Sequence, residues 1–146
     1  LNGVLIFFLE MPIVSYIEKH KINKLKVITY GCLAMAISIY LLLINNWAGI
    51  LIIMMIFMTF AEMFAFPFSN SFAMSRAPKG HEGRYMAIFT MSYSLAHILS
   101  AKTGMEMIDI FSYQANWFFM GTLGIIGVSL FIWVIKLVQK EPIREL

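Results

Sequence analysis

Long apolar runs alternate with short polar segments along this chain. The runs cover residues 1–17, 27–44, 48–75, 85–101 and 115–138. Each is close to, or longer than, the roughly 17 residues that a helix needs to cross a bilayer. The pattern predicts an all-α membrane protein in the form of a bundle of five transmembrane helices.

The basic residues lie on one side of this pattern. Ten of the 11 Lys and Arg residues fall between runs one and two, between runs three and four, or at and beyond the end of run five: Lys19, Lys21, Lys24, Lys26, Arg76, Lys79, Arg84, Lys136, Lys140 and Arg144. The opposite segments, 45–47 and 106–114, contain none. Because basic loops stay in the cytoplasm, we expect a multi-pass protein of the inner (plasma) membrane, with a cytoplasmic C-terminus and residue 1 near the outer face.

Composition excludes most soluble classes. With 60% hydrophobic and 13% charged residues, the chain has too little polar surface to coat a globule in water. The net charge of +3 comes from residues spread over short loops, so we expect contact with lipid headgroups and not with nucleic acid. The single Cys32 cannot form a disulfide within the chain, and it lies in an apolar run as a packing residue.

No enzymatic or metal-binding pattern is present in the sequence. The three His residues are separated by loops and by depth in the predicted bundle, and no Ser, His and acid set accompanies them. The Gly repeat at 121, 124 and 127 is a helix-packing pattern and not a nucleotide loop, and the small residues of the second run suggest the same use. We therefore expect no cofactor, no metal and no enzyme activity.

Ionisable residues and prolines interrupt the first and third runs. Glu10 and Pro12 lie in the first, so this helix is predicted to bend or open near the cytoplasmic side. The third run has 28 residues, roughly 42 Å of helix, which exceeds a hydrocarbon core of about 30 Å. Pro67 is expected to kink it, and Glu62 lies near the membrane centre. A carboxyl group at that depth is a candidate for proton or substrate binding.

The fourth run has one polar face. Thr90, Tyr93, His97 and Ser100 follow a spacing of three and four residues, which places them on one side of a helix. His97 lies near the predicted midplane. Lys102 lies closer to the outer surface.

Each of these side chains also has a structural interpretation. Glu62 can hydrogen-bond a neighbouring helix, Glu10 can pair with a basic loop residue, and His97 can be a packed hydrogen-bonding residue. Lys102 can extend outward beside Glu106 or bind an anion. The residues alone leave these interpretations open.

Two segments resemble a known family. The pattern is Glu62-Met63-x3-Pro67-x2-Asn70-x7-Pro78-x4-Gly83-Arg84-Tyr85-Met86. It is similar to helix ten, the following loop and helix eleven of the major facilitator superfamily, especially its drug:proton antiporter-like branch. The loop from Glu18 and Lys19 through Lys24 to Lys26 resembles the acidic and basic repeat after helix eight, but it lacks the Gly and uses Lys instead of Arg.

The resemblance covers essentially the whole chain as helices eight to twelve of twelve. It implies two six-helix halves that rock about a central cavity, so that a small solute and protons reach one site from alternate sides. The initial Leu and the odd number of runs also predict a longer protein whose N-terminal half is absent from this sequence. Together with the residues singled out above, we expect a proton and substrate pathway that comprises Glu62, Glu10, His97, Tyr93 and Lys102.

Three functional classes fit these observations. We favour a secondary active transporter, because of the midplane carboxylate, the proline in the third run and the matching loop pattern. A membrane-embedded enzyme would use Glu10, Glu62 and His97 as acid and base. The third class is a non-transporting membrane scaffold.

Overall fold

The computed structural model describes residues 2–44 and 47–140, with side chains to residue 138. Residue 1, positions 45 and 46 of the predicted outer segment, and Arg144 lie outside the described residues. The all-α prediction is confirmed. The described chain forms α1 (Asn2–Lys19), α2 (Lys24–Leu41), α3 (Ile50–Ser75), α4 (Glu82–Ile110) and α5 (Tyr113–Lys140). Among the described residues, α2, α3 and the stretch Tyr113–Val138 of α5 are long and apolar enough to cross a membrane.

The helix boundaries differ from the predicted runs by up to three residues at most ends, and by more at the end of α4. α4 continues to Ile110, so the predicted end at residue 101 is wrong and most of segment 106–114 is helical. The last turns of α4, from Lys102 to Ile110, continue as helix although the apolar run has ended. Lys102 pairs with Glu106 one turn later at 3.9 Å. α2 ends at Leu41 instead of residue 44, because the apolar residues that follow form tighter turns with hydrogen bonds to the third residue back.

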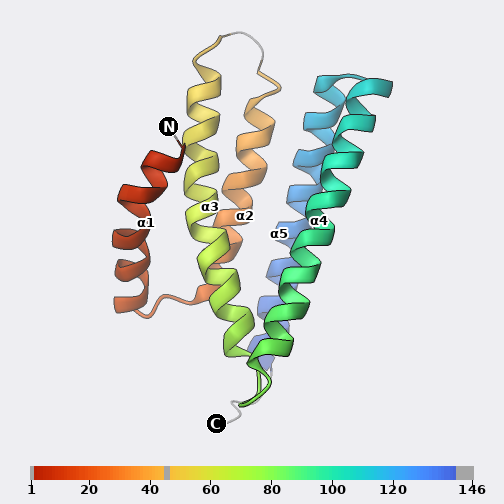
Figure 1. Ribbon diagram of the computed structural model, residues 1–146. Helices are drawn as coiled ribbons and strands as arrows, with labels where there is room; N and C mark the ends of the chain where they lie inside the picture. Colours follow the sequence, from red (N-terminus) through yellow and green to blue (C-terminus); the bar gives the residue numbers. More distant parts are fainter. Residues whose placement is uncertain (1, 45–46, 141–146) are drawn as a thin grey trace.

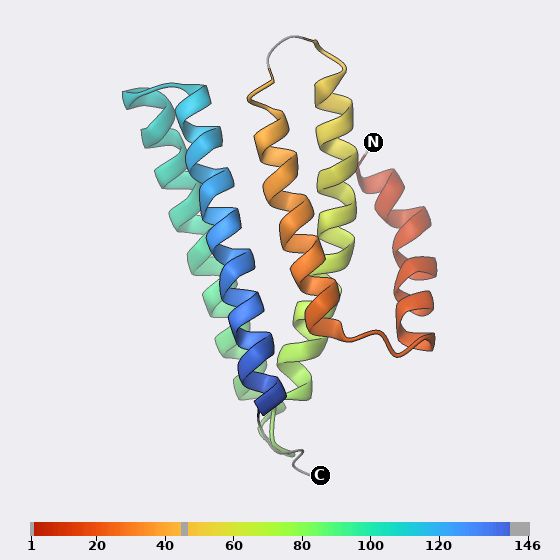
Figure 2. The same ribbon diagram turned by 180° about the vertical axis from the view of Figure 1, so that it is seen from behind.

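The helices run alternately up and down. α3 and α4 lie on the near side in Figure 1, whereas α2 and α5 lie on the near side in Figure 2. α2 packs against both α3 and α5, α1 packs mainly against α3, and α4 contacts α3 and α5. Both views show α4 and α5 leaning away from α2 and α3 toward the top. The loops at 20–23 and 76–81 and the end of α5 share the bottom end, which we call the basic end.

Small residues allow α2 to approach both neighbours closely. A Cβ on Gly31 would lie 2.9 Å from the Ala65 backbone nitrogen of α3. On the α5 side, a Cβ on Gly124 would lie 2.9 Å from the Ala36 Cβ, and one on Gly121 would lie 2.8 Å from the Tyr40 ring. The predicted packing role of small residues in these helices is therefore borne out at these contacts. It does not extend to Gly127, where nothing lies within 4 Å of the added atom.

A buried cluster joins the first three helices near the basic end. Ile17 from α1, Val27 and Ile28 from α2, and Phe68 from α3 are all buried in it. Dispersion contacts in this cluster position the last turn of α1 against the bundle. Pro12 and Pro67 both lie inside helices that continue through them. α1 therefore does not open at Pro12, and both views show α3 changing direction in its lower half.

Candidate functional site

Glu62 lies halfway along the 26 residues of α3 and belongs to a polar group that links α3 with the start of α1. Its Oε2 accepts a hydrogen bond from Asn2 Nδ2 at 3.0 Å. The hydroxyl of Thr59 donates to Asn2 Oδ1 at 2.7 Å, and it also lies 2.7 Å from the carbonyl oxygen of Met55. Thr59 is fully buried, while Asn2 and Glu62 are half-buried. We call Asn2, Thr59 and Glu62 the polar triad.

Sequence reasoning found only one member of this triad. Thr59 precedes Glu62 by three residues and so shares its helical face, and Asn2 is an amide within an apolar run. These signals were present. The two residues could be assigned a role only from the packing of α1 against α3, because nothing in the sequence specifies that these helices are neighbours.

A row of aromatic side chains connects α3 to α4 one turn below Glu62. The Phe66 and Tyr93 rings meet edge to face, with centroids 5.9 Å apart and planes at 90°. The Tyr93 and His97 rings follow with centroids 5.4 Å apart. We call Phe66, Tyr93 and His97 the aromatic row. The structure therefore brings Tyr93 and His97 together beside Phe66. Sequence reasoning had singled out Tyr93 and His97 but not Phe66.

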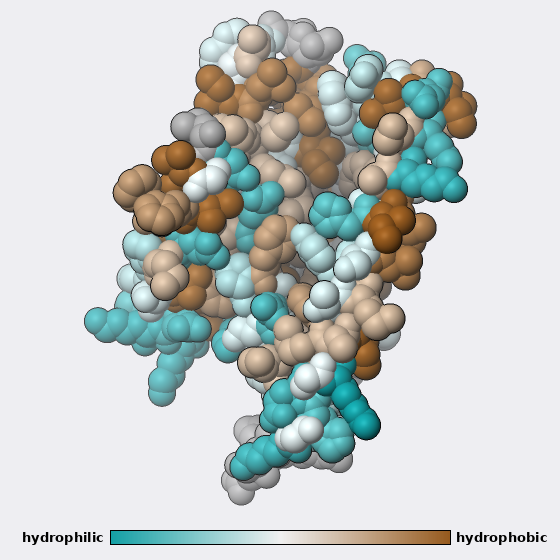
Figure 3. Space-filling model, in the orientation of Figure 1, coloured by the Kyte–Doolittle hydropathy of each residue, from teal (hydrophilic) through white to brown (hydrophobic). Residues whose placement is uncertain are grey.

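The side chains of α4 next to this row have little cover within the described chain. Every residue from Thr90 to Lys102 is exposed, although this stretch forms the middle of a long helix. Figure 3 shows a hollow between α3 and α4 in the upper half of this face, with hydrophilic side chains on the surface beside it. The triad and the aromatic row thus belong to a partly polar face that α2 and α5 do not cover.

Two of the predicted pathway residues lie away from this group. Glu10 is half-buried on α1, about 12 Å along the helix from Asn2, and it makes no hydrogen bond or ion pair with a described residue. Lys102 lies about 8 Å along α4 from His97. Its 3.9 Å contact with Glu106 joins two exposed side chains, 73% and 60% accessible, so the pair contributes little to stability.

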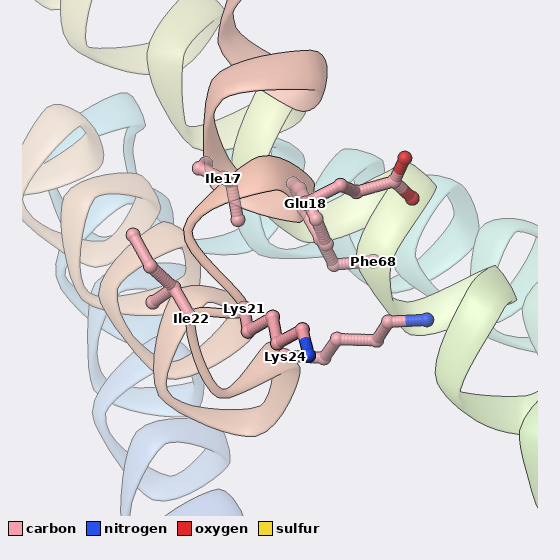
Figure 4. Close-up of a pocket in the computed structure, with 6 residues that line it drawn as sticks. All are labelled: Ile17, Glu18, Lys21, Ile22, Lys24 and Phe68. Carbon is pink, nitrogen blue, oxygen red and sulfur yellow. The ribbon is translucent and has the colours of Figure 1, made fainter.

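The loop residues surround a second hollow, at the basic end. This cleft of about 410 Å³ is lined by Ile17, Glu18, Lys21, Ile22, Lys24 and Phe68. Figure 4 shows the Glu18 carboxylate directed away from the two ammonium groups. Lys24 Nζ donates to Ser71 Oγ of α3 at 2.6 Å, which ties the first turn of α2 to α3. Lys19 is the exposed last residue of α1.

Gly83 and Arg84 lie in the first turn of α4, where both are exposed. The turn that precedes them contains Gly80 with a φ of +83°. Only glycine adopts this backbone conformation readily, so Gly80 allows the chain to reverse between α3 and α4.

The groups gathered at this face are a hydrogen-bonded carboxyl group and exposed aromatic rings. A carboxyl group held by an amide can accept a proton or attract a cation, and exposed rings can pack against an organic solute. Within the described residues, no group of three or more His, Cys, Asp or Glu side chains is arranged to hold a metal ion.

Comparison with known proteins identifies the family. The family model of the Major Facilitator Superfamily matches residues 1–145. Neither the search of curated proteins nor the search of solved structures found a match. The matched range includes all five helices, the polar triad and the aromatic row. The chain therefore belongs to the major facilitator superfamily, whose members are membrane transporters and not enzymes.

Proposed function

We propose that these helices are numbers eight to twelve of a twelve-helix carrier that moves a small solute by alternating access coupled to protons. The resemblance of the Glu62 to Met86 pattern to the drug:proton antiporter-like branch supports this assignment. The face of α1, α3 and α4 would then meet the N-terminal half of the same protein across a central cavity. All five helices would cross the inner membrane.

The observation that carries the proposal is the position of Glu62. It lies halfway along an apolar helix, yet it is hydrogen-bonded at an uncovered face and lies one turn from the aromatic row. A carboxyl group at this depth is costly to bury in lipid, and such groups typically face the bundle interior or a water-filled cavity along a transport pathway. In the outward-open state Glu62 takes up a proton, and after the halves rock it releases that proton to the cytoplasm. A cationic solute favours the ionised form and so couples the two movements.

The remaining pathway residues take supporting roles in this proposal. Tyr93 and His97 line the cavity with Phe66, because their exposed rings form one continuous surface. Glu10 lies on the cytoplasmic route, and Lys102 lies near the outer mouth.

The orientation of the carrier follows from its charges. Lys24 and Lys26 at the start of α2 and Lys136 near the end of α5 share the basic end, which the positive-inside bias assigns to the cytoplasm. The C-terminus is then cytoplasmic. A reporter that folds only in the cytoplasm should fluoresce when fused after residue 146, and a dark but stably inserted fusion would contradict this orientation.

Ethidium, an organic cation, is a suitable probe of transport. In proteoliposomes that contain the full-length protein, an acidic interior should drive ethidium uptake, and Glu62→Gln should reduce uptake to that of empty vesicles. Glu82→Gln is a matched control, since Glu82 is exposed in the first turn of α4 at the basic end. Uptake that is independent of the gradient, or that survives Glu62→Gln, would remove the proton role. A wild-type protein that moves no ethidium would contradict the antiporter assignment.

A further inference from the structure

The hydrogen bonds around Glu62 define which way the Asn2 side chain faces. An amide has an acceptor oxygen on one arm and two N–H donors on the other. Here the oxygen faces the Thr59 hydroxyl at 2.7 Å, and the nitrogen faces Glu62 Oε2 at 3.0 Å. The three side chains form a chain of donors and acceptors. A hydroxyl that donates to the amide oxygen therefore leaves the amide N–H groups directed at the carboxylate.

We propose that Asn2 is a positioning residue for Glu62 and that the buried hydroxyl of Thr59 fixes the Asn2 amide with its N–H donors toward the carboxylate. The inference rests on the proposed function, because it concerns the same carboxyl group. It adds two residues from outside the predicted pathway, and it assigns them an effect on proton binding instead of direct contact with the solute.

The direction of this effect follows from hydrogen-bond chemistry. An amide N–H group can only donate, and an ionised carboxylate can only accept. Hydrogen bonds to charged groups are worth roughly twice those between neutral groups. In the observed orientation, the Asn2 amide therefore presents its N–H donors, and not its acceptor oxygen, to the Glu62 carboxylate. If the amide were turned over, its oxygen would face the ionised carboxylate, and two acceptors would repel each other.

Thr59 can support this orientation because of where it lies. It is fully buried on α3, three residues before Glu62, so its position relative to the carboxylate is set by the helix itself. Its single hydroxyl proton has two acceptors at 2.7 Å, Asn2 Oδ1 and the Met55 carbonyl oxygen. Donation to Asn2 is the arrangement that leaves both amide N–H groups available to Glu62.

Other titratable groups do not make the same contact. Among the described residues of the helices around α3, none besides Asn2 has a hydrogen bond or ion pair to Glu62. The titratable side chains in the middle parts of these helices are Glu10 on α1, Tyr30 and Cys32 on α2, and Tyr93 and His97 on α4, while Tyr40 lies at the end of α2. The aromatic row brings the last two nearest, through Phe66 one turn from Glu62.

Infrared spectroscopy can follow the protonation of Glu62 without knowledge of the solute. The carboxyl C=O band that disappears in Glu62→Gln is titrated against pH in the full-length protein in lipid vesicles. We expect Asn2→Leu to raise the midpoint of this titration by about one pH unit, since the ionised form loses its donor. Thr59→Val should raise it by less, and Thr59→Ser, which keeps the hydroxyl, should leave it unchanged.

A combined variant tests whether Thr59 acts through Asn2. In the Asn2→Leu background, Thr59→Val should cause no additional change in the midpoint. If Thr59 acted independently of Asn2, its substitution would change the midpoint further. An unchanged midpoint in Asn2→Leu, or a Glu62 band that does not titrate in any variant, would overturn the inference. If the midpoints change as expected but Glu62→Gln still couples transport to protons, the proposed function fails and the inference stands. Size-exclusion profiles identify variants that do not fold, and a changed midpoint in a folded Thr59→Ser protein, which keeps the hydroxyl, would also contradict the inference.

Discussion

The ring of Tyr93 on α4 meets the ring of Phe66 on α3 edge to face, with the ring centroids 5.9 Å apart. α3 and α4 share few other contacts, and toward the top of the bundle they separate. The pair therefore joins the two helices that line the proposed cavity. Such pairs contribute about 0.5–1.5 kcal/mol beyond the burial of their surface.

Removal of either ring should weaken the contact between α3 and α4. We expect Tyr93→Ala and Phe66→Ala each to destabilise the full-length protein in detergent, and the double variant to cost about 0.5–1.5 kcal/mol less than the sum. Tyr93→Phe keeps the ring and serves as the control, with stability close to wild type. Additive single effects would show that the rings do not interact.

The close approach of α2 to α3 at Gly31 should not accept a side chain. A Cβ at this position would lie 2.9 Å from a backbone nitrogen, which cannot move aside cheaply. Gly31→Ala should therefore lower the free energy of unfolding by about 1–3 kcal/mol, measured by equilibrium denaturation in mixed micelles. Gly127→Ala is the matched control, since open space surrounds that position. Equal stability of the two variants would contradict the observed packing.

A hydrogen bond between α2 and α5 should make a small, measurable contribution. The Tyr40 hydroxyl lies 3.0 Å from Thr122 Oγ1, which itself donates to the Phe118 carbonyl oxygen, so Tyr40 is the donor. Tyr40→Phe and Thr122→Val should show a coupling of about 0.6 kcal/mol in a double-mutant cycle, typical of bonds between membrane helices. A coupling near zero would indicate that the Tyr40 hydroxyl bonds elsewhere in the bilayer.

Hydropathy predicted the five helices because each one needs an apolar surface to cross or face lipid. It failed at the end of α4, where Lys102 and Glu106 end the apolar run but not the helix. It also placed the end of α2 too late, because Leu42 to Ile44 are apolar and yet form tighter turns. An apolar run indicates that a segment lies in lipid or in the protein interior. Where the helix ends depends instead on which backbone hydrogen bonds form.

The candidate site was less accessible to sequence reasoning. Glu62 and His97 could be singled out because ionisable side chains are rare in apolar helices. Asn2, Thr59 and Phe66 could not be assigned a role, because their importance comes from partners on other helices. Such contacts between distant segments follow from how the helices pack, which a single sequence does not specify.

The central claim is that Glu62 faces a water-filled pathway and not lipid, and cysteine labelling tests it most directly. Cys32 is the only cysteine in this sequence, so Cys32→Ala, combined with replacement of any cysteine elsewhere in the full-length protein, provides the background for Glu62→Cys and Leu130→Cys. Leu130 on α5 is 55% exposed and Glu62 is half-buried, so simple exposure predicts faster labelling at position 130.

In intact membranes, a membrane-impermeant maleimide requires water at the thiol. The account predicts that Glu62→Cys reacts and that Leu130→Cys remains unlabelled until the membrane is dissolved. Labelling at position 130 with none at position 62 would contradict it.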